Sequence, residues 1–288
     1  MSNKPSATYA IVTGASSGIG YAFAQALAKR GYNLLLVSNV PEIHEAAEKI
    51  KSSISNLQSP ISNLQSPISN LQSPISNLQS PIEVVGLVLD LGQQSSAREL
   101  YEYAHAHEME VEVLVNNAGV YHDKDILDDS EGFTSLIMNL HMYTPAMLCY
   151  LFGQDMKQRR KGYILNVCSV TSKMAAQRLG TYGSTKAFLC NFTRALHIEL
   201  RKYGVNVTDV SPGAVDTGLY SIPPFMTKFG KCLGIIVSPE TLAKRGLWAL
   251  FHGCAKTTIP TVFWRVLCLL ILLTPTCVLR LIRRLGWF

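Results

Sequence analysis

Residues 13–20 read TGASSGIG, and they join two segments whose apolar residues recur with different periods. The run before it, Thr8–Thr13, is short, apolar and β-branched, which is typical of a buried strand. The segment after it, Ile19–Arg30, has helical spacing and ends at Gly31. Glycines at such a junction allow a tight turn that presents the N–H groups of a helix N-terminus to a phosphate. Alone, the turn is a weak signal, because a purely structural turn has the same composition.

Strand-like and helix-like runs alternate along the rest of the chain. Asn33–Ser38 is almost continuously apolar, as expected for a strand of a parallel sheet covered on both faces. Similar runs follow at Val84–Leu89, Val111–Val115, Tyr163–Val167 and Asn206–Val210. Helical patterns lie between them, the clearest at Ile43–Lys51 and Tyr182–Tyr203. The alternation predicts a single α/β domain with a parallel sheet.

Composition excludes several classes of protein. The 288 residues are 48% hydrophobic and 16% charged, which excludes global disorder. The net charge is +6, but seven basic and no acidic residues follow Thr241, which leaves 19 basic against 20 acidic residues in the rest. A nucleic-acid-binding face is therefore not expected. The seven cysteines form no C-x-x-C pair and the histidines form no ligand cluster, so we expect reduced thiols, no metal site and a cytoplasmic location.

The heptapeptide ISNLQSP occurs four times in tandem over residues 54–81. A proline in every copy excludes a coiled coil, because it removes a helical hydrogen bond and clashes with the preceding turn. The repeats fall between a predicted helix and a predicted strand, where a long surface insertion costs little closure entropy. We expect a poorly ordered, functionally neutral loop, and a binding segment is the alternative.

Four further motifs stand at the ends of the predicted elements. Three follow predicted strands, and one begins the longest predicted helix. They are Asn116-Asn117-Ala118-Gly119, Ser169, Tyr182-Gly183-Ser184-Thr185-Lys186, and Pro212-Gly213 with Thr217. With the glycine turn, and in this order, they resemble the short-chain dehydrogenase/reductase family from about Ala7 to Thr217, apart from the repeats. The resemblance implies a Rossmann-type, doubly wound parallel sheet over residues 1–258 and an NAD(P)-dependent oxidoreductase.

The resemblance also implies which residues bind the dinucleotide. The glycine turn would cradle the pyrophosphate, Asp90 would meet the adenine, the residues after Asn116 would line the ribose, and the segment from Pro212 would cover the nicotinamide. Asn116 itself is expected to hold the sheet together. The full predicted set is Gly14, Ser16, Ser17, Gly18, Ile19, Gly20, Ser38, Asp90, Leu91, Asn117, Ala118, Gly119, Tyr182, Lys186, Pro212, Gly213, Val215 and Thr217.

The predicted chemistry is proton transfer beside a hydride transfer. Lys186 stands four residues after Tyr182, on the same helix face, and its charge favours the phenolate. Tyr182 is the predicted acid in reduction and base in oxidation, and Ser169 would hydrogen-bond the substrate oxygen. By resemblance, Lys186 also holds the ribose hydroxyls, and Asn139 is the fourth catalytic member, supporting a water-linked proton path to the lysine. Cys168, beside Ser169, is expected to have a packing role.

The choice between NADP and NAD depends on the end of the second predicted strand. NAD-specific members of the family usually carry an acid there for the ribose 2′-hydroxyl, and NADP-specific members often carry an arginine nearby. Ser38-Asn39 provides neither. Because no acid repels a 2′-phosphate, the sequence favours NADP, with NAD as the alternative.

The tail, residues 259–288, is unusual for soluble members of this family. Val262–Leu273 is apolar except for Arg265, and Pro275 separates it from a basic amphipathic end. The apolar run is too short for a secure membrane span. The pattern favours attachment in a membrane interface, and a true span or packing onto the body or a dimer partner are the alternatives.

The predicted activity is NADPH-dependent reduction of a lipophilic ketone. The tail and the apolar stretch Ile222–Met226, in the usual substrate-loop region, favour 3-oxoacyl, ketosteroid or keto-sphingoid substrates by analogy with membrane-associated members. The alternatives are a cofactor-binding regulatory protein or scaffold without turnover, and an epimerase or dehydratase. The family is mostly dimeric or tetrameric through the helix that bears Tyr182, so we expect a homodimer or homotetramer.

Overall fold

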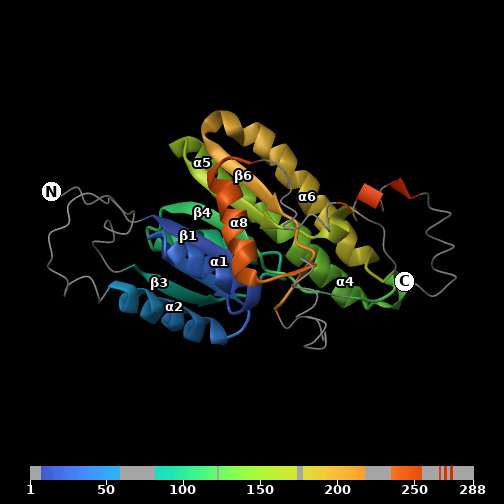
Figure 1. Cartoon of the computed structure of the whole chain (residues 1–288), viewed down its shortest axis with the longest axis horizontal. Coiled ribbons are helices and arrows are strands. Elements are labelled where there is room, and N and C mark those ends of the chain that lie inside the picture. Colours follow the sequence, from blue (N-terminus) through green and yellow to red (C-terminus); the bar gives the residue numbers. More distant parts are fainter. Residues whose placement is uncertain are drawn as a thin grey trace.

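A parallel sheet of six strands lies at the centre of the computed structural model (Figure 1), which describes residues 8–58, 82–121, 123–173, 178–217, 235–254, 266, 269, 270, 273 and 274. The strands are β1 Tyr9–Thr13, β2 Asn33–Ser38, β3 Val84–Val88, β4 Val111–Asn116, β5 Gly162–Val167 and β6 Val205–Val210. Their order in the sheet is β3-β2-β1-β4-β5-β6. The order reverses between β1 and β4, which confirms the predicted doubly wound, Rossmann-type domain and places a ligand crevice at the carboxyl ends of these strands.

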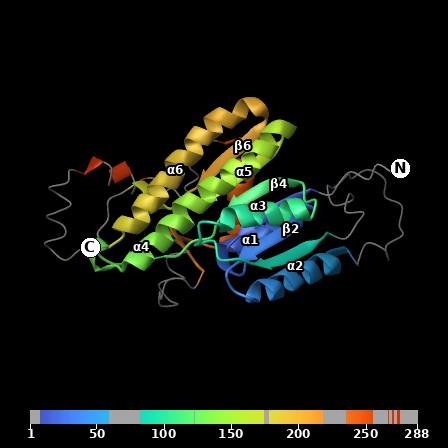
Figure 2. The ribbon, with the colours of Figure 1, turned by 180° about the vertical axis from the view of Figure 1, so that it is seen from behind.

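Helices cover both faces of the sheet (Figures 1 and 2). One face packs against α1 Gly18–Ala28, α2 Glu42–Gln58 and α8 Pro239–Phe251, and the other against α3 Ser96–Ala106, α5 Thr144–Arg159 and α6 Gly180–Leu200. Each face forms its own hydrophobic core, and every residue of β2 is buried. Burial on both faces is the reason for the nearly continuous apolar run of this strand.

A continuous helical segment approaches the crevice from the second face. α4, Glu131–Met138, begins at Ser130, whose side chain caps the helix by accepting a hydrogen bond from the Phe133 N–H. It passes through a π-helical turn, η4 Asn139–Tyr143, into α5. The remaining short elements are the 3₁₀ turns η3 Ile126–Asp128, η5 Val170–Lys173 and η6 Arg201–Tyr203, and a second small parallel sheet of β7 Ala214–Val215 and β8 Ile236–Val237.

The first repeat behaves differently from the prediction. α2 continues to Gln58, and Ile54 is buried with Ile43, Ala47 and Ile50 in the core. These four residues lie on one helix face, at intervals of four and three residues, and the first proline of the repeats comes only at position 60. The predicted poorly ordered loop is therefore wrong for Ile54–Gln58, because the apolar stripe of the helix extends into the repeat. Residues 59–81 lie outside the described residues.

Two other predictions fall largely outside the described part of the chain. The stretch Ile222–Met226 lies outside it entirely, and of the tail only residues 266, 269, 270, 273 and 274 are described. Among the residues that the structure describes, no helix combines the length and the apolar character that crossing a membrane requires.

Candidate active site

The glycine turn between β1 and α1 has the backbone shape that its sequence predicts. Gly14 and Gly18 have φ angles of +63° and +57°, in a region of backbone conformation that residues with a Cβ atom rarely adopt. A Cβ atom on Gly14 would meet the Ala118 backbone at 2.9 Å, and one on Gly20 would overlap the Gly14 carbonyl oxygen. The chain thus brings the N-terminus of α1 tightly against the end of β1, where its first N–H groups lack helical partners.

Asn117 and Thr13 fix this turn to the neighbouring strand. The Asn117 Nδ2 donates to the carbonyl oxygens of Thr13 and Gly14 at 2.9 and 3.1 Å. The Thr13 Oγ1 accepts from the Asn117 and Ala118 N–H groups at 2.9 and 3.0 Å. Asn117 therefore shapes the cradle as well as standing beside the predicted ribose site. Thr13 was not found from the sequence, although its position directly before the first glycine could have indicated it.

A cleft of about 350 Å³ opens at the carboxyl ends of β1, β4 and β5. The predicted site residues that line it are Gly14, Ser17, Gly18, Ile19, Asn117, Gly119, Ser169, Tyr182, Lys186, Pro212, Gly213, Val215 and Thr217. Leu91 and Ala118 instead line a much smaller cavity beside it. The glycine cradle, which any added Cβ would fill, and the helix N-terminus behind it fit the pyrophosphate of a dinucleotide.

Three of the predicted cofactor residues, Ser16, Ser38 and Asp90, do not line the cleft. Ser38, at the end of β2, is buried, and its hydroxyl donates to the Ser16 Oγ at 3.2 Å. The Asp90 carboxylate is exposed and accepts from the Gln93 Nε2 and the Gly92 N–H, each at 2.9 Å. These two hydrogen bonds hold the pKa of Asp90 below its usual range. The contacts of these residues with a nucleotide stay predictions.

Lys186 and Tyr182 project from the first turns of α6 into the cleft. The Lys186 Nζ lies 5.9 Å from the centroid of the Tyr182 ring and donates to the Val167 carbonyl oxygen at 3.2 Å. Lys186 is only 5% exposed, and burial lowers its pKa to about 8. An ammonium held this close to the phenol favours the phenolate electrostatically.

Ser169 stands two residues after the end of β5 and lines the same cleft. Its Oγ accepts from the Thr171 hydroxyl at 2.9 Å and from the Thr171 N–H at 3.2 Å. Because Ser169 is the acceptor in both bonds, its own hydrogen can be donated to a substrate oxygen. The local 3₁₀ turn η5 thus orients the hydroxyl for the predicted role.

Of the remaining predicted residues, one lies inside the sheet, one lines the cleft and one lines neither cavity. The Asn116 Nδ2 donates to the Asn166 Oδ1 at 2.8 Å, so this side chain joins β4 to β5 inside the sheet, as predicted. Cys168 lines the cleft, and burial raises the pKa of its thiol well above its ordinary value. Asn139 is half-buried at the start of η4 and lines neither of these two cavities. Its part in a proton path stays a prediction.

Two aromatic neighbours of Tyr182 were not found from the sequence. Tyr121 and His141 both meet the Tyr182 ring edge to face, with centroids 5.6 Å away. Tyr121 follows the Asn-Ala-Gly motif by only two residues, and this position could have indicated it. His141 gave no signal, because the π-helical turn changes which residues of this helix face the site.

The sequence of this chain is similar to a family model and to proteins of one family. The model described as short chain dehydrogenase matches residues 8–62 and 61–221. The chain is 30% identical over 217 residues to hydroxysteroid dehydrogenase-like protein 1 of Gallus gallus, covering 74% of this chain and 57% of that protein. It is 28% identical over 259 residues to a very-long-chain 3-oxoacyl-CoA reductase of Anas platyrhynchos, covering 85% and 71%. The chain thus spans little more than half the length of the first relative.

The fold comparison agrees with this result. A short-chain dehydrogenase from Sphingobium yanoikuyae, solved in complex with NADPH, matches with a TM-score of 0.70 at 22% identity, covering 90% of this chain and 92% of that one. The family model covers well over half of the chain, including the glycine turn and the segment with Ser169, Tyr182 and Lys186. The chain therefore belongs to the short-chain dehydrogenase family.

Proposed function

We propose that this protein reduces the carbonyl group of a lipophilic ketone to the alcohol with NADPH. The observation that carries the proposal is the convergence of Ser169, Tyr182 and Lys186 on one cleft beside a glycine cradle. Three groups that can bind, protonate and electrostatically stabilise a carbonyl oxygen face one space. The complete set argues against the alternative of a binding protein without turnover.

The residues of the chain have distinct roles in this mechanism. The nicotinamide supplies the hydride when it is bound. Tyr182 donates its hydroxyl proton to the carbonyl oxygen as negative charge develops there, and Ser169 donates a hydrogen bond to the same oxygen. Lys186 stabilises the phenolate that remains, and by family resemblance it also holds the ribose hydroxyls and receives protons along a path supported by Asn139. In the oxidative direction Tyr182 accepts the proton instead.

The lipophilic substrate class is supported by the relatives and by the tail. Several matched proteins are named very-long-chain 3-oxoacyl-CoA reductases, and one is named for hydroxysteroids. The described apolar side chains of the tail are half-exposed or more, at Val266, Leu269, Leu270 and Leu273. We propose that the tail attaches this protein peripherally to a membrane interface, where 3-oxoacyl, ketosteroid or keto-sphingoid substrates concentrate.

An oligomer formed through α5 and α6 belongs to the same proposal. Tyr150 on α5 and Phe188 and Ile198 on α6 are exposed at 58%, 39% and 76%. Exposed large apolar side chains on two helices that contact each other favour contact with another chain. A homodimer or homotetramer would cover them.

The Ser38→Asp variant is expected to reverse the preference for NADPH. A carboxylate at this buried position, beside the Ser16 hydroxyl, would repel a 2′-phosphate and accept from a 2′-hydroxyl. The ratio of kcat/KM for NADPH to that for NADH should fall on the order of 10²-fold. The uncharged Ser38→Asn variant is the control and should keep the wild-type preference. A wild-type enzyme that already favours NADH would contradict the assignment of NADP.

A panel of ketones tests the proposed function itself. Wild-type protein is incubated with NADPH and short-chain, 3-oxoacyl, steroid and sphingoid ketones, and both cofactor oxidation and alcohol product are measured. We expect turnover that rises with the apolar surface of the substrate. NADPH binding without turnover on any ketone would support the scaffold alternative, and preferential turnover of small polar ketones would contradict the lipophilic class.

A further inference from the structure

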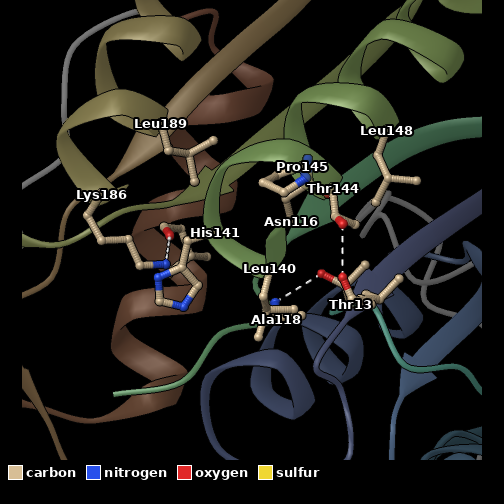
Figure 3. Close-up of a pocket in the computed structure, with 12 residues that line it drawn as sticks. Thr13, Asn116, Ala118, Leu140, His141, Thr144, Pro145, Leu148, Lys186 and Leu189 are labelled. Atoms are coloured by element: carbon tan, nitrogen blue, oxygen red, sulfur yellow. Dashed lines mark hydrogen bonds between the residues drawn. The ribbon is translucent and has the colours of Figure 1, made fainter. Parts of the chain in front are cut away.

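His141 lies on the π-helical turn η4 and is buried beside Lys186. Only 1% of its surface is exposed, and it lines a cavity of about 10 Å³ next to the cleft. In Figure 3 the side chains of His141 and Lys186 meet at this cavity. The space is large enough for about one water molecule, so the imidazole is closely packed.

The hydrogen bonds of His141 define one tautomer. The Nε2 accepts from the Val120 N–H at 3.0 Å, and since a backbone N–H can only donate, this nitrogen carries no proton. The Nδ1 lies 3.1 Å from the Thr185 Oγ1, whose own hydrogen is donated to the Tyr182 carbonyl oxygen at 2.8 Å. The ring is therefore neutral, with its proton on Nδ1 donated to Thr185.

These bonds connect the two segments that surround the reacting groups. One bond holds the loop after β4 at Val120, and the other holds the turn of α6 that carries Tyr182. The imidazole also packs edge to face against the Tyr182 ring. A Cβ on Gly119 would come within 2.9 Å of the His141 Nε2 and 3.5 Å of the Lys186 Nζ, so the glycine makes room for both groups.

We propose that His141 is a positioning residue of this active site, which holds Tyr182 and Lys186 in register through Thr185 and Val120. The proposal rests on the proposed function, because the register is that of the proton-donating pair. Burial and the nearby Lys186 charge keep the pKa of His141 well below its ordinary value, so the ring stays neutral and adds no charge to the site. A second cation there would compete with the Lys186 ammonium.

The test uses two variants that differ in the bonds they keep. His141→Phe preserves an aromatic ring against Tyr182 but removes both hydrogen bonds and places carbon where the Lys186 ammonium now has a polar neighbour. His141→Gln keeps an acceptor for the Val120 N–H. An apolar neighbour makes the charged form of Lys186 less favourable, so Tyr182 should ionise at higher pH.

The first measurement needs no cofactor or substrate. The tyrosinate absorbance of the apo protein is titrated, and the same titration of a Tyr182→Phe protein is subtracted to isolate this phenol. We expect the midpoint to rise by half a unit or more in His141→Phe and by less in His141→Gln. Imidazole ¹⁵N spectra, assigned by comparison with His141→Gln, should show the Nδ1–H tautomer of His141 from pH 5.5 to 8.

Kinetics provide the second measurement and Leu148→Ala the control. We expect kcat of His141→Phe to fall at least tenfold with KM for NADPH within threefold, and partial recovery in His141→Gln. Leu148 lines the same cavity, so Leu148→Ala should lower the melting temperature without moving the phenol titration. If the titration midpoint of Tyr182 does not move in His141→Phe, the proposal is overturned. The same holds if the midpoint moves in Asn139→Ala but not in His141→Phe. Absence of turnover in the wild type would instead contradict the proposed function, while the titration and the spectra would still test His141.

Discussion

Replacing Tyr182 by phenylalanine is expected to lower kcat by about 10²–10⁴-fold, the usual contribution of a positioned acid or base. The change removes one hydroxyl and keeps the ring, so the edge-to-face contacts with Tyr121 and His141 persist. Binding of NADPH should therefore change little. Steady-state kcat on the best ketone of the panel and NADPH affinity from fluorescence measure the two effects separately.

Tyr103→Phe is the matched control for this change. It also deletes a phenolic hydroxyl, but on α3, where the ring stacks on His107 away from the cleft. We expect its kcat to stay within twofold of the wild type. If Tyr182→Phe kept a tenth or more of the wild-type kcat, the proton would have another donor and the mechanism would be wrong.

Sequence patterns predicted the strands and the glycine turn because their physical causes are local. Burial on both faces makes β2 apolar throughout, and the left-handed backbone at Gly14 requires glycine whatever the rest of the fold does. The boundary of α2 was harder to predict. Ile54 is the first residue of the repeats, yet its side chain is buried in the hydrophobic core. Only its packing with the other buried residues of α2 shows that the helix continues into the first repeat.

The site residues could be predicted from the sequence where their positions follow from the end of a strand or from the spacing along a helix. Ser169, Tyr182 and Lys186 follow such rules, and they meet in one cleft. Thr13 and His141 were missed for a different reason. Each acts through bonds to residues about 20 to 100 positions away, and His141 enters the site from a π-helical turn that α-helical spacing does not describe.

Lys186→Met is expected to inactivate the enzyme and yet stabilise the fold. Lys186 is 5% exposed, and its pKa is lowered by burial from 10.5 to about 8. A difference of this size means that holding the charged form in the native state at pH 7 costs about 3 kcal/mol. Methionine fills a similar volume without a charge, although the Val167 carbonyl loses a donor. The net gain should be about 2 kcal/mol in the free energy of unfolding, or a rise in Tm of about 4–8 °C.

The pH dependence of this gain identifies its cause. Between pH 8 and 10.5 the unfolded wild-type chain binds a proton at Lys186 that the native protein has released, so wild-type stability rises with pH relative to the variant. The advantage of methionine should be full below pH 8 and shrink toward zero by pH 10.5. Urea unfolding at pH 7, 9 and 10.5 measures it, with Lys49→Met as the control, since Lys49 is 63% exposed and its replacement should leave stability almost unchanged. A Lys186→Met protein less stable than the wild type at pH 7 would mean that the ammonium is solvated or paired in the native state, and its buried charge could not then be what holds the Tyr182 phenolate.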